Sequence, residues 1–463
     1  MLSVFRKTLF KPNLVLTRSL SSKLIKMKLE SAKFESVLTP ELNTLSQLFI
    51  KHGYELRIAG GAVRDLLMDK TPTDIDFATT ATPDQMKEMF EKEEVRMINN
   101  KGEEHGTITA RINDKENYEV TTLRIDKVTD GRRAEVEFTV DWEVDANRRD
   151  LTINSMFLGL DGILYDYFNG HEDLKSKTVR FVGDPVQRIQ EDYLRILRYF
   201  RFYGRISSEA DNHEDETVTA IKDNVGGMDR ISGERIWMEW KKILNGNFSL
   251  ELTMKMIEVG LGPYIGLPSN PNLGEFNNVL SRCEKLNLKL ESTAKLAALL
   301  STEDEVLKLH SRLKLSGLER DLCLFVVKNR ENLPPHANPI RPYQFLAVDS
   351  KLKPQDTRSF IEQVLIYRGD VDLLQEFSQW TVPRFGVTGH HLKEAGCPPG
   401  KMMSLVLGKL KDEWKEQEFK IDVEELVKRI PSVLDAIDPK EIRALSPPRS
   451  KKAKHAKMEG LKL

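Results

Sequence analysis

Two aspartates one residue apart, Asp74 and Asp76, follow the glycine pair Gly60-Gly61 at a short distance along the chain. Residues two apart on a strand point to the same face, so we expect these two carboxylates to aim together. Mg²⁺ prefers oxygen ligands and usually binds substrate phosphates as well. Two solvated carboxylates in a turn would give the same short pattern. In combination with the glycine pair, however, the pattern predicts a catalytic Mg²⁺ site at Asp74 and Asp76.

The glycine pair itself predicts a phosphate site. Gly60 and Gly61 leave backbone N–H groups accessible at the start of an expected helix, whose dipole favours anions. Arg64, inside that helix, adds a forked donor that suits phosphate oxygens. We therefore expect these three residues to bind the phosphates of a nucleotide.

A third carboxylate, Glu119, lies on the expected strand Tyr118–Ile125. If this strand neighbours the one that carries Asp74, Glu119 completes the catalytic carboxylate set; the alternative is a surface glutamate on an edge strand. Arg124 fits a positioning residue or a surface cation equally well. The charged stretch Asp126–Arg133 has no apolar period and predicts a mobile loop.

The cluster Arg148-Arg149-Asp150 is expected at a helix start. Arg149 could bind a triphosphate or a ribose, and Asp150 could accept a hydrogen bond from a sugar hydroxyl. A solvated first helical turn is the alternative interpretation.

The segment that starts at Pro185 predicts a long amphipathic helix. Its apolar positions recur at helical spacing and include Ile189 and Phe200. The opposite side carries charged residues, namely Arg188, Glu191, Asp192, Arg195 and Arg198. Such a stripe is ordinarily a solvent face held together by ion pairs three and four residues apart. The residues alone do not decide between that interpretation and a binding surface.

Taken together, these motifs resemble the class II tRNA CCA-adding enzymes of the polymerase β-type nucleotidyltransferase superfamily. The resemblance runs from about Phe34 to Trp414. Besides G-G and D-x-D, it rests on segments that occur in the family's order, namely 148–154 (RRDLTIN), 166–170 (DYFNG), 191–195 (EDYLR) and 232–235 (SGER). The resemblance implies an α+β fold, in which a mixed α/β head with a five-stranded sheet precedes an all-α neck, body and tail.

The resemblance also implies residue roles. Asp192 and Arg195 would form a protein template for the incoming base, with Glu191 as support. A carboxylate can accept from the exocyclic amino group of cytosine or adenine while an arginine donates to the ring nitrogen, and guanine and uracil present the inverse pattern. The full implied nucleotide-binding set is Gly60, Gly61, Arg64, Arg148, Arg149, Asp150, Asn154, Asp192, Arg195, Arg198 and Arg201.

The elements expected around these residues change in kind along the chain. Expected strands at Tyr54–Gly61, Asp74–Ala78, Val95–Ile98 and Gly106–Ile112 belong to the head, and a helical texture begins near Asp184. The expected domains are a targeting segment (1–29), head (30–170), neck (171–267), body (268–382), tail (383–445) and basic C-terminus (446–463).

Composition sets the broad class. The chain has 463 residues, of which 40% are hydrophobic and 30% charged, which suits a folded protein with large cores. No run approaches the ~18 apolar residues of a membrane helix, so no membrane is expected. The net charge of −1 does not by itself indicate nucleic-acid binding, so any contact with RNA must come from local basic patches. The three cysteines do not predict a disulfide scaffold.

Both termini are basic. Residues 1–29 contain lysines, arginines and serines but no acidic residue, which is typical of a mitochondrial transit peptide; a basic tail is the alternative. Met27 could serve as a second start. The end after Pro447-Pro448 is either a nuclear address or a solvated tail. We expect a mitochondrial location with cytoplasmic and nuclear pools.

The expected function is template-independent addition of C, C and A to tRNA 3′ ends from CTP and ATP by two-metal nucleotidyl transfer, with Asp74 and Asp76 as the metal ligands. Contacts are expected to the acceptor end and elbow of tRNA and none to DNA. A poly(A) polymerase or a CC- or A-adding relative is the alternative enzyme, and a non-catalytic RNA-binding protein is the alternative of another class.

Residues 386–411 predict either a tRNA contact or a capped amphipathic helix. His390, His391 and Cys397 lack further ligands at zinc spacing and are expected to be ordinary polar residues. Oligomeric state is not indicated.

Overall fold

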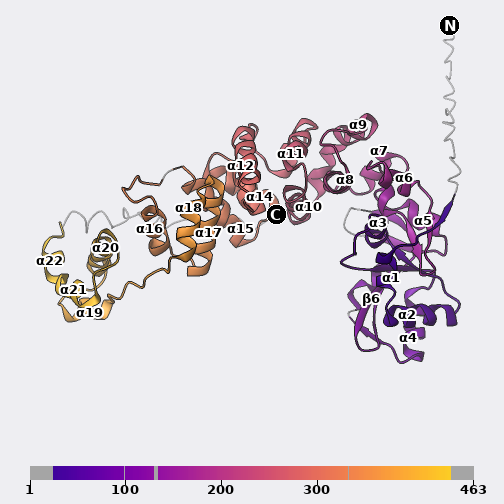
Figure 1. The fold of residues 1–463 in the computed structure, drawn as a ribbon, viewed down its shortest axis with the longest axis horizontal. Helices are drawn as coiled ribbons and strands as arrows, with labels where there is room; N and C mark the ends of the chain where they lie inside the picture. The colour runs from indigo at the N-terminus through magenta and orange to yellow at the C-terminus, as the bar shows by residue number, and fades with distance from the viewer. Residues whose placement is uncertain (1–23, 99, 130–133, 332, 439–463) are drawn as a thin grey trace, which may run out of the picture. The chain divides into compact units, whose positions relative to one another are not determined.

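The computed structural model describes residues 24–98, 100–129, 134–331 and 333–438. The chain forms two compact units that divide between Lys328 and Asn329. The first unit begins with a mixed α/β head and continues in helices, and the second is helical (Figure 1). The expected fold class is therefore confirmed. The division falls inside the predicted body, 268–382, and the finer domain borders stay predictions.

The head contains one eight-stranded sheet in the order β1-β10-β9-β2-β3-β6-β5-β4, in which only the β3–β6 pair is parallel. Its strands are β1 (Ile25–Lys28), β2 (Leu56–Ala59), β3 (Asp76–Thr79), β4 (Arg96–Ile98), β5 (Thr107–Ile112), β6 (Glu116–Thr122), β9 (Phe157–Gly159) and β10 (Ile163–Asp166). The sheet is larger than the five strands expected. Strands of three or four residues, such as β1, β9 and β10, are too short to show a clear alternation in sequence.

The expected strand Tyr118–Ile125 is two strands, because the chain leaves the main sheet at Leu123. Beyond it, β7 (Arg124–Thr129) pairs with β8 (Ala134–Phe138) as a separate two-stranded ribbon. The prediction of a loop from Asp126 is therefore wrong for its first residues, and residues 130–133 lie outside the described residues. Ile125 and Phe138, two apolar residues of this ribbon, are exposed, so apolar residues here do not mark a face packed on the core.

Helices cover the head sheet at positions that their caps predict. Thr39 caps α2 through its side chain, and Thr82 forms a capping box at α4 with Gln85. The helices of the head are α1 (Ala32–Val37), α2 (Pro40–Lys51), α3 (Gly61–Leu67), α4 (Pro83–Lys92), α5 (Trp142–Asn147) and α6 (Gly170–Lys175), with 3₁₀ turns η1 (Asn100–His105) and η2 (Thr152–Asn154).

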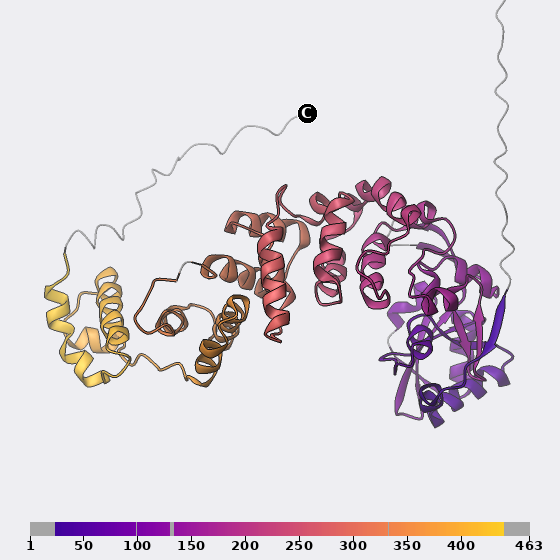
Figure 2. The same ribbon diagram turned by 45° about the horizontal axis from the view of Figure 1, so that its top comes forward.

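The rest of the first unit is helical (Figures 1 and 2). They are α7 (Pro185–Glu191), α8 (Arg195–Ile206), α9 (Asp215–Asn224), η3 (Val225–Arg230), α10 (Gly233–Leu244), α11 (Ser249–Glu258), η4 (Gly262–Ile265), α12 (Leu273–Lys285), α13 (Ser292–Ala297), α14 (Glu303–Leu313) and α15 (Gly317–Asn329). Trp240 on α10 is fully buried.

The second unit has its own core, which gathers Val406, Leu410 and Trp414 with Leu426 and Ile430. Its helices are α16 (Arg341–Asp349), α17 (Pro354–Arg368), α18 (Val371–Gln379), α19 (Gly389–Glu394), α20 (Lys401–Glu416), α21 (Val423–Lys428) and α22 (Ile430–Asp435). Among the described residues of both units, no helix is long and apolar enough to cross a membrane.

The turn after β10 shows why the segment 166–170 is so specific. The buried carboxylate of Asp166 accepts hydrogen bonds from the backbone N–H groups of Phe168 (3.2 Å), Gly170 (3.0 Å) and His171 (2.9 Å). Asn169 adopts a left-handed conformation with φ 58°. One side chain thereby satisfies three donors and sets the direction in which α6 leaves the sheet.

We expect Asp166→Ala to lower the free energy of unfolding, by about 1–3 kcal/mol for each donor that it leaves buried and unpaired. Asp166→Asn keeps one acceptor oxygen and should cost less. Denaturant unfolding measures both. Asp161→Ala is the matched control, because the exposed Asp161 carboxylate serves a single N–H, that of Ile163. Equal stability of the Asp166→Ala and Asp161→Ala proteins would contradict this role.

Candidate active site

The carboxylates of Asp76 and Glu119 lie next to each other at one edge of a large cavity. β3 and β6 run parallel with Asp76 directly opposite Glu119, while Phe77 and Val120 face the core. The strand adjacency on which the interpretation of Glu119 depended is therefore confirmed. Asp74 is exposed in the bend before β3 rather than on the strand, so the expected strand begins two residues later than predicted.

The three carboxylates act on one another electrostatically. Partial burial raises the pKa of Asp76, and repulsion from Glu119 and Asp74 raises it further, whereas Arg149 lowers it. Clustered carboxylate oxygens that repel one another suit a divalent cation with oxygen ligands, so the residues present fit Mg²⁺. Across the described residues, no three His, Cys, Asp or Glu side chains are already gathered as a complete ligand set. Mg²⁺ bound by one or two carboxylates usually takes its other oxygens from substrate phosphates and water.

The glycine pair stands where β2 turns into α3. Gly60 has φ 63°, and a Cβ there would lie 3.2 Å from an arginine nitrogen of Arg149. Gly61 is the first residue of α3. Glycine thus allows both the left-handed backbone and the close approach of the arginine.

Arg64 is buried against the wall of the cavity instead of extending into it. Its guanidinium donates to the side-chain oxygens of Asn154 (2.5 Å) and Asp65 (3.1 and 3.2 Å). Burial lowers the pKa of Arg64, and the Asp65 carboxylate offsets part of that effect. Asp65 in turn accepts two hydrogen bonds from Arg205 on α8, so this group ties the glycine turn to the helical neck.

Arg148 is the C-cap of α5 and Arg149 follows it, so the prediction that they stand at a helix start is wrong. Asp145, one turn earlier, holds both of them: its carboxylate accepts from Nε of Arg148 (2.8 Å) and from Nη2 of Arg149 (3.0 Å). Asp145 is fully buried, and these two arginines lower its pKa despite that burial. Our sequence analysis missed Asp145, although its spacing of three and four residues from the arginines indicates such pairs.

The predicted continuous helix from Pro185 is interrupted. α7 ends at Glu191, Asp192 is extended with φ −153° and ψ 105°, and α8 begins at Arg195. The charged stripe survives the break, because the turn places Asp192, Arg195 and Arg198 all on the wall of the cavity. We call residues 192–194 the α7–α8 interruption.

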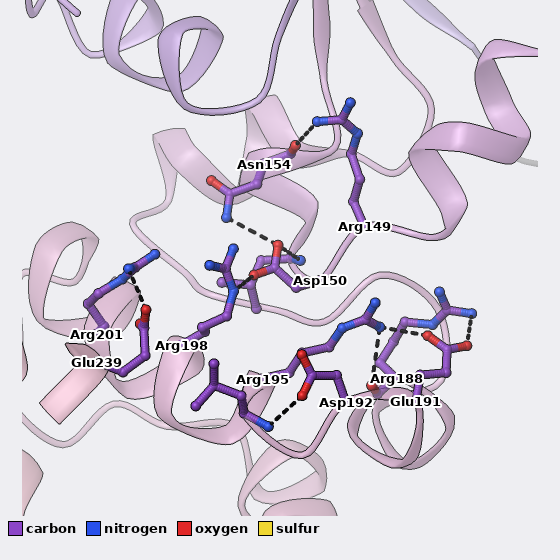
Figure 3. A network of polar contacts seen from close by, with 12 residues as sticks. Arg149, Asp150, Asn154, Arg188, Glu191, Asp192, Arg195, Arg198, Arg201 and Glu239 are labelled. Carbon is purple, nitrogen blue, oxygen red and sulfur yellow. Dashed lines mark hydrogen bonds and ion pairs between the residues drawn. The ribbon is translucent and has the colours of Figure 1, made fainter. Parts of the chain in front are cut away.

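The charged side chains of this wall form pairs (Figure 3). Arg195 donates to Glu191 (2.6 Å) and to the carbonyl oxygen of Arg148 (2.9 Å), and Arg198 donates to Asp150 (2.6 Å). Burial raises the pKa of Asp150, but Arg198 outweighs that effect and the pKa is lowered. Asp150 is therefore a buried anion that accepts from Arg198 and Asn154.

Two further residues, both on α10, pair with side chains of the wall. Arg235 donates to Asp192 (2.8 Å), and Glu239 accepts from Arg201 (3.0 Å). The resemblance included Arg235 without a role, and Glu239 was missed. Its position four residues after Arg235, on the same face of α10, was the available signal.

One cavity of about 1090 Å³ brings most of the predicted residues together. Its lining includes the carboxylates of Asp76 on β3 and Glu119 on β6 and, from the predicted nucleotide-binding set, Gly60, Gly61, Arg64, Arg148, Arg149, Asp150, Asn154, Asp192, Arg195, Arg198 and Arg201. Asp74 and Glu191 stand beside it, the former close enough to raise the pKa of Asp76 and the latter paired with Arg195. The cavity thus has an anionic edge and an arginine-rich wall.

The weaker candidates lie in the second unit. His391 belongs to the capping box that starts α19, His390 is exposed, and Cys397 is buried in the core. These positions agree with their interpretation as ordinary residues. Residues 386–411 form α19 and the first part of α20, and their contact with tRNA stays a prediction.

Two family models match the first unit of the chain. A family model described as the Poly A polymerase head domain matches residues 56–180. A second, described as the probable RNA and SrmB-binding site of polymerase A, matches residues 213–268.

Proteins with similar sequences cover most of the chain. The mouse protein named CCA tRNA nucleotidyltransferase 1, mitochondrial, is 53% identical over 88% of this chain and 93% of its own length. The human protein of the same name is 52% identical over the same shares. A CCA-adding enzyme of Bacillus subtilis is 38% identical over 57% of this chain and 64% of its own length.

Solved structures agree on the fold. The CCA-adding enzyme of Bacillus stearothermophilus in complex with CTP has a TM-score of 0.66 at 24% identity, covering 87% of this chain and 98% of its own. The Thermotoga maritima CCA-adding enzyme complexed with tRNA has a TM-score of 0.62 at 20% identity, covering 89% and 99%. On the strength of the sequence relatives, this chain belongs to the family of CCA-adding tRNA nucleotidyltransferases, within the class II nucleotidyltransferases, and is a nucleotidyltransferase enzyme.

Proposed function

We propose that this enzyme adds C, C and A to the 3′ ends of tRNA, using CTP and ATP without a nucleic-acid template. One observation supports this most: the carboxylates Asp76 and Glu119 share a cavity with the pair Asp192 and Arg195. A nucleotide can thus have its reacting phosphate at the first pair and its base at the second. The related proteins are named for this reaction, and solved relatives are described in complex with CTP, ATP and tRNA.

In the proposed reaction, a tRNA 3′-hydroxyl attacks the α-phosphate of the nucleotide and pyrophosphate leaves. Asp74, Asp76 and Glu119 would hold Mg²⁺, which when bound lowers the pKa of the attacking hydroxyl and stabilises the leaving group. The backbone at Gly60-Gly61 and the guanidinium of Arg149 would bind the phosphates. Positioning and charge stabilisation supply most of the catalysis in such transfers.

The base would be selected at Asp192 and Arg195. The carboxylate of Asp192 accepts from an exocyclic amino group, and Arg195 donates to the adjacent ring nitrogen of cytosine or adenine. Guanine and uracil would instead place a carbonyl oxygen next to the Asp192 carboxylate and an N–H next to the Arg195 guanidinium, so neither hydrogen bond could form. Each unpaired group costs about 1–3 kcal/mol, so the inverse pattern disfavours both.

A second candidate is polymerisation of adenosine, since the head matches the Poly A polymerase head domain. Sequence similarity over the longer range favours CCA addition. The mouse protein named CCA tRNA nucleotidyltransferase 1 is 53% identical over 88% of this chain, whereas the Poly A polymerase head model matches only residues 56–180. Incubation with a tRNA that lacks its end, Mg²⁺ and single nucleotides separates the two. CCA addition predicts two C and one A incorporated in order, whereas a poly(A) polymerase adds A alone and continues.

The carboxylate cluster gives a direct test of the metal site. Asp76→Ala should abolish incorporation of both C and A while tRNA binding survives, since the metal ligand is lost but the arginine-rich wall is not. Removing a mutually repelling charge should leave the melting temperature unchanged or higher. Glu116→Ala, on the same strand as Glu119 but outside the cavity lining, is the control. Near-normal turnover of Asp76→Ala would refute the metal assignment.

The Asp192 carboxylate gives a test of base choice. Asp192→Asn should weaken discrimination against UTP and GTP by about 1–3 kcal/mol, or roughly 5- to 150-fold, because the amide no longer repels a carbonyl oxygen. The measurement is kcat/KM for CTP, ATP, UTP and GTP on tRNA ends of the appropriate length. Lys222→Ala, an exposed change on α9, should leave all four values as they are. A uniform loss with unchanged ratios would show that Asp192 only stabilises the wall.

We further propose a mitochondrial location, with cytoplasmic and nuclear pools; the mouse and human relatives are named mitochondrial. Residues 1–29 fused to a reporter should carry it into mitochondria. Ile25–Lys28 form β1 and pair with β10, so processing that keeps the head intact must occur before Ile25. Translation from Met27 should therefore leave the enzyme outside mitochondria and also lower its stability. A reporter that stays diffuse with the full segment attached would rule out targeting.

A further inference from the structure

Tyr193 differs from its neighbours in the α7–α8 interruption. Asp192, Leu194 and Arg195 all line the cavity, whereas Tyr193 is not among the described residues that line it. Its ring lies instead against Gly227 in η3. A Cβ built on Gly227 would meet two atoms of this ring at 2.0 Å and a third at 2.3 Å. The ring therefore occupies the space that any side chain at residue 227 would need.

Glycine at residue 227 is required by this contact and not by the backbone. The residues with positive φ do not include Gly227, so alanine could adopt its conformation. The same holds for Gly226, where the nearest atom to a Cβ is the Tyr264 hydroxyl at an ordinary 3.7 Å. Two adjacent glycines of one 3₁₀ turn thus differ in one respect, the presence of the Tyr193 ring.

The atoms around Tyr193 connect it to both proposed base-reading residues. The Asp192 carboxylate accepts from the N–H of Leu194 (3.1 Å) and from Arg235 (2.8 Å). The Asp192 carbonyl oxygen accepts from the N–H of Arg195 (2.9 Å). These bonds close a tight turn around Tyr193, so a displacement of its backbone must move the Asp192 carboxylate and the start of α8.

We infer that the seating of the Tyr193 ring on Gly227 sets the orientation of Asp192 and Arg195, which makes Tyr193 and Gly227 positioning residues for base selection. This inference rests on the proposed function, in which Asp192 and Arg195 read the base. The ring anchors the interruption to η3, and Arg235 on α10 fixes the carboxylate from the other side. The guanidinium of Arg230 lies 5.7 Å from the centre of the ring, above it, and helps to hold it.

Rigid seating is what base selection by two hydrogen bonds requires. A displacement of about 1 Å at a positioned group can cost on the order of 100-fold in rate, even when the change lies outside the reacting atoms. The Tyr193 ring cannot yield as a flexible chain end would, because the atoms that meet the added carbon belong to the body of the ring. An added methyl group at residue 227 must therefore displace Tyr193.

The test compares Gly227→Ala with Gly226→Ala in the full-length enzyme. Gly227→Ala should lower the preference for CTP and ATP over UTP and GTP, measured as ratios of kcat/KM, by about 10- to 100-fold. Gly226→Ala should leave the ratios unchanged. Binding of tRNA should survive in both proteins, since neither glycine lines the cavity.

A second pair of variants tests the contact from the other side. Tyr193→Phe keeps the ring and should keep the ratios, whereas Tyr193→Ala should lower them. In Tyr193→Ala/Gly227→Ala the added methyl group meets no ring, so the double variant should select bases no worse than Tyr193→Ala alone. Such non-additivity is the signature of a direct contact. If Gly227→Ala does not fold, the Tyr193→Phe and Tyr193→Ala proteins decide the question.

The outcomes separate this inference from the proposed function. Unchanged ratios in Gly227→Ala and Tyr193→Ala, together with altered ratios in Asp192→Asn, would overturn the inference and leave the function standing. An equal loss for all four nucleotides in Gly227→Ala would also overturn it, because a merely structural role predicts that result. Unchanged ratios in Asp192→Asn would instead count against base reading by Asp192 itself.

Discussion

This active site is held together by hydrogen bonds from buried arginine side chains to carboxylates and backbone carbonyls. Arg64, Arg195 and Arg198 are all largely withdrawn from water, and each donates to a carboxylate or a backbone carbonyl of the same wall. Removing one partner of such a pair leaves a buried charge and costs about 3–5 kcal/mol. The head and neck are therefore held together by the same groups that line the cavity. Bonds that cross from neck to head include those of Arg195 to the carbonyl of Arg148, Arg198 to Asp150 and Arg205 to Asp65.

This pairing also explains the charge distribution of the cavity. Along the wall the carboxylates of Asp145, Asp150 and Glu239 pair with arginines and offset part of the repulsion among these cations. At the carboxylates of β3 and β6 the reverse holds, because Asp76 lies opposite Glu119, and partial burial together with this repulsion raises the pKa of Asp76. An anionic edge facing a cationic wall suits a substrate that brings both a metal ion and phosphates.

The sequence predicted most of this site because short motifs carry its chemistry. Three short motifs contain residues that lie on the cavity or beside it, namely the glycine pair, D-x-D and the segment 191–195. The break at Asp192 could not be predicted, since apolar residues such as Ile189 and Leu197 keep helical spacing across it. The ring of Tyr193, which counts as one of those apolar positions, in fact packs on Gly227. Asp145 and Glu239 were missed because acceptors for arginines are set by three-dimensional packing, although their helical spacing was available.

The central claim is that the Asp192 carboxylate accepts from the exocyclic amino group of the incoming base. Its most direct test replaces ATP with purine ribonucleoside 5′-triphosphate, which differs from ATP only in lacking the exocyclic amino group. In the unaltered enzyme the analogue should lose about 1–3 kcal/mol in kcat/KM relative to ATP. In Asp192→Asn the same replacement should cost much less, since the carboxylate it addresses is gone. An equal loss in both enzymes would contradict the claim.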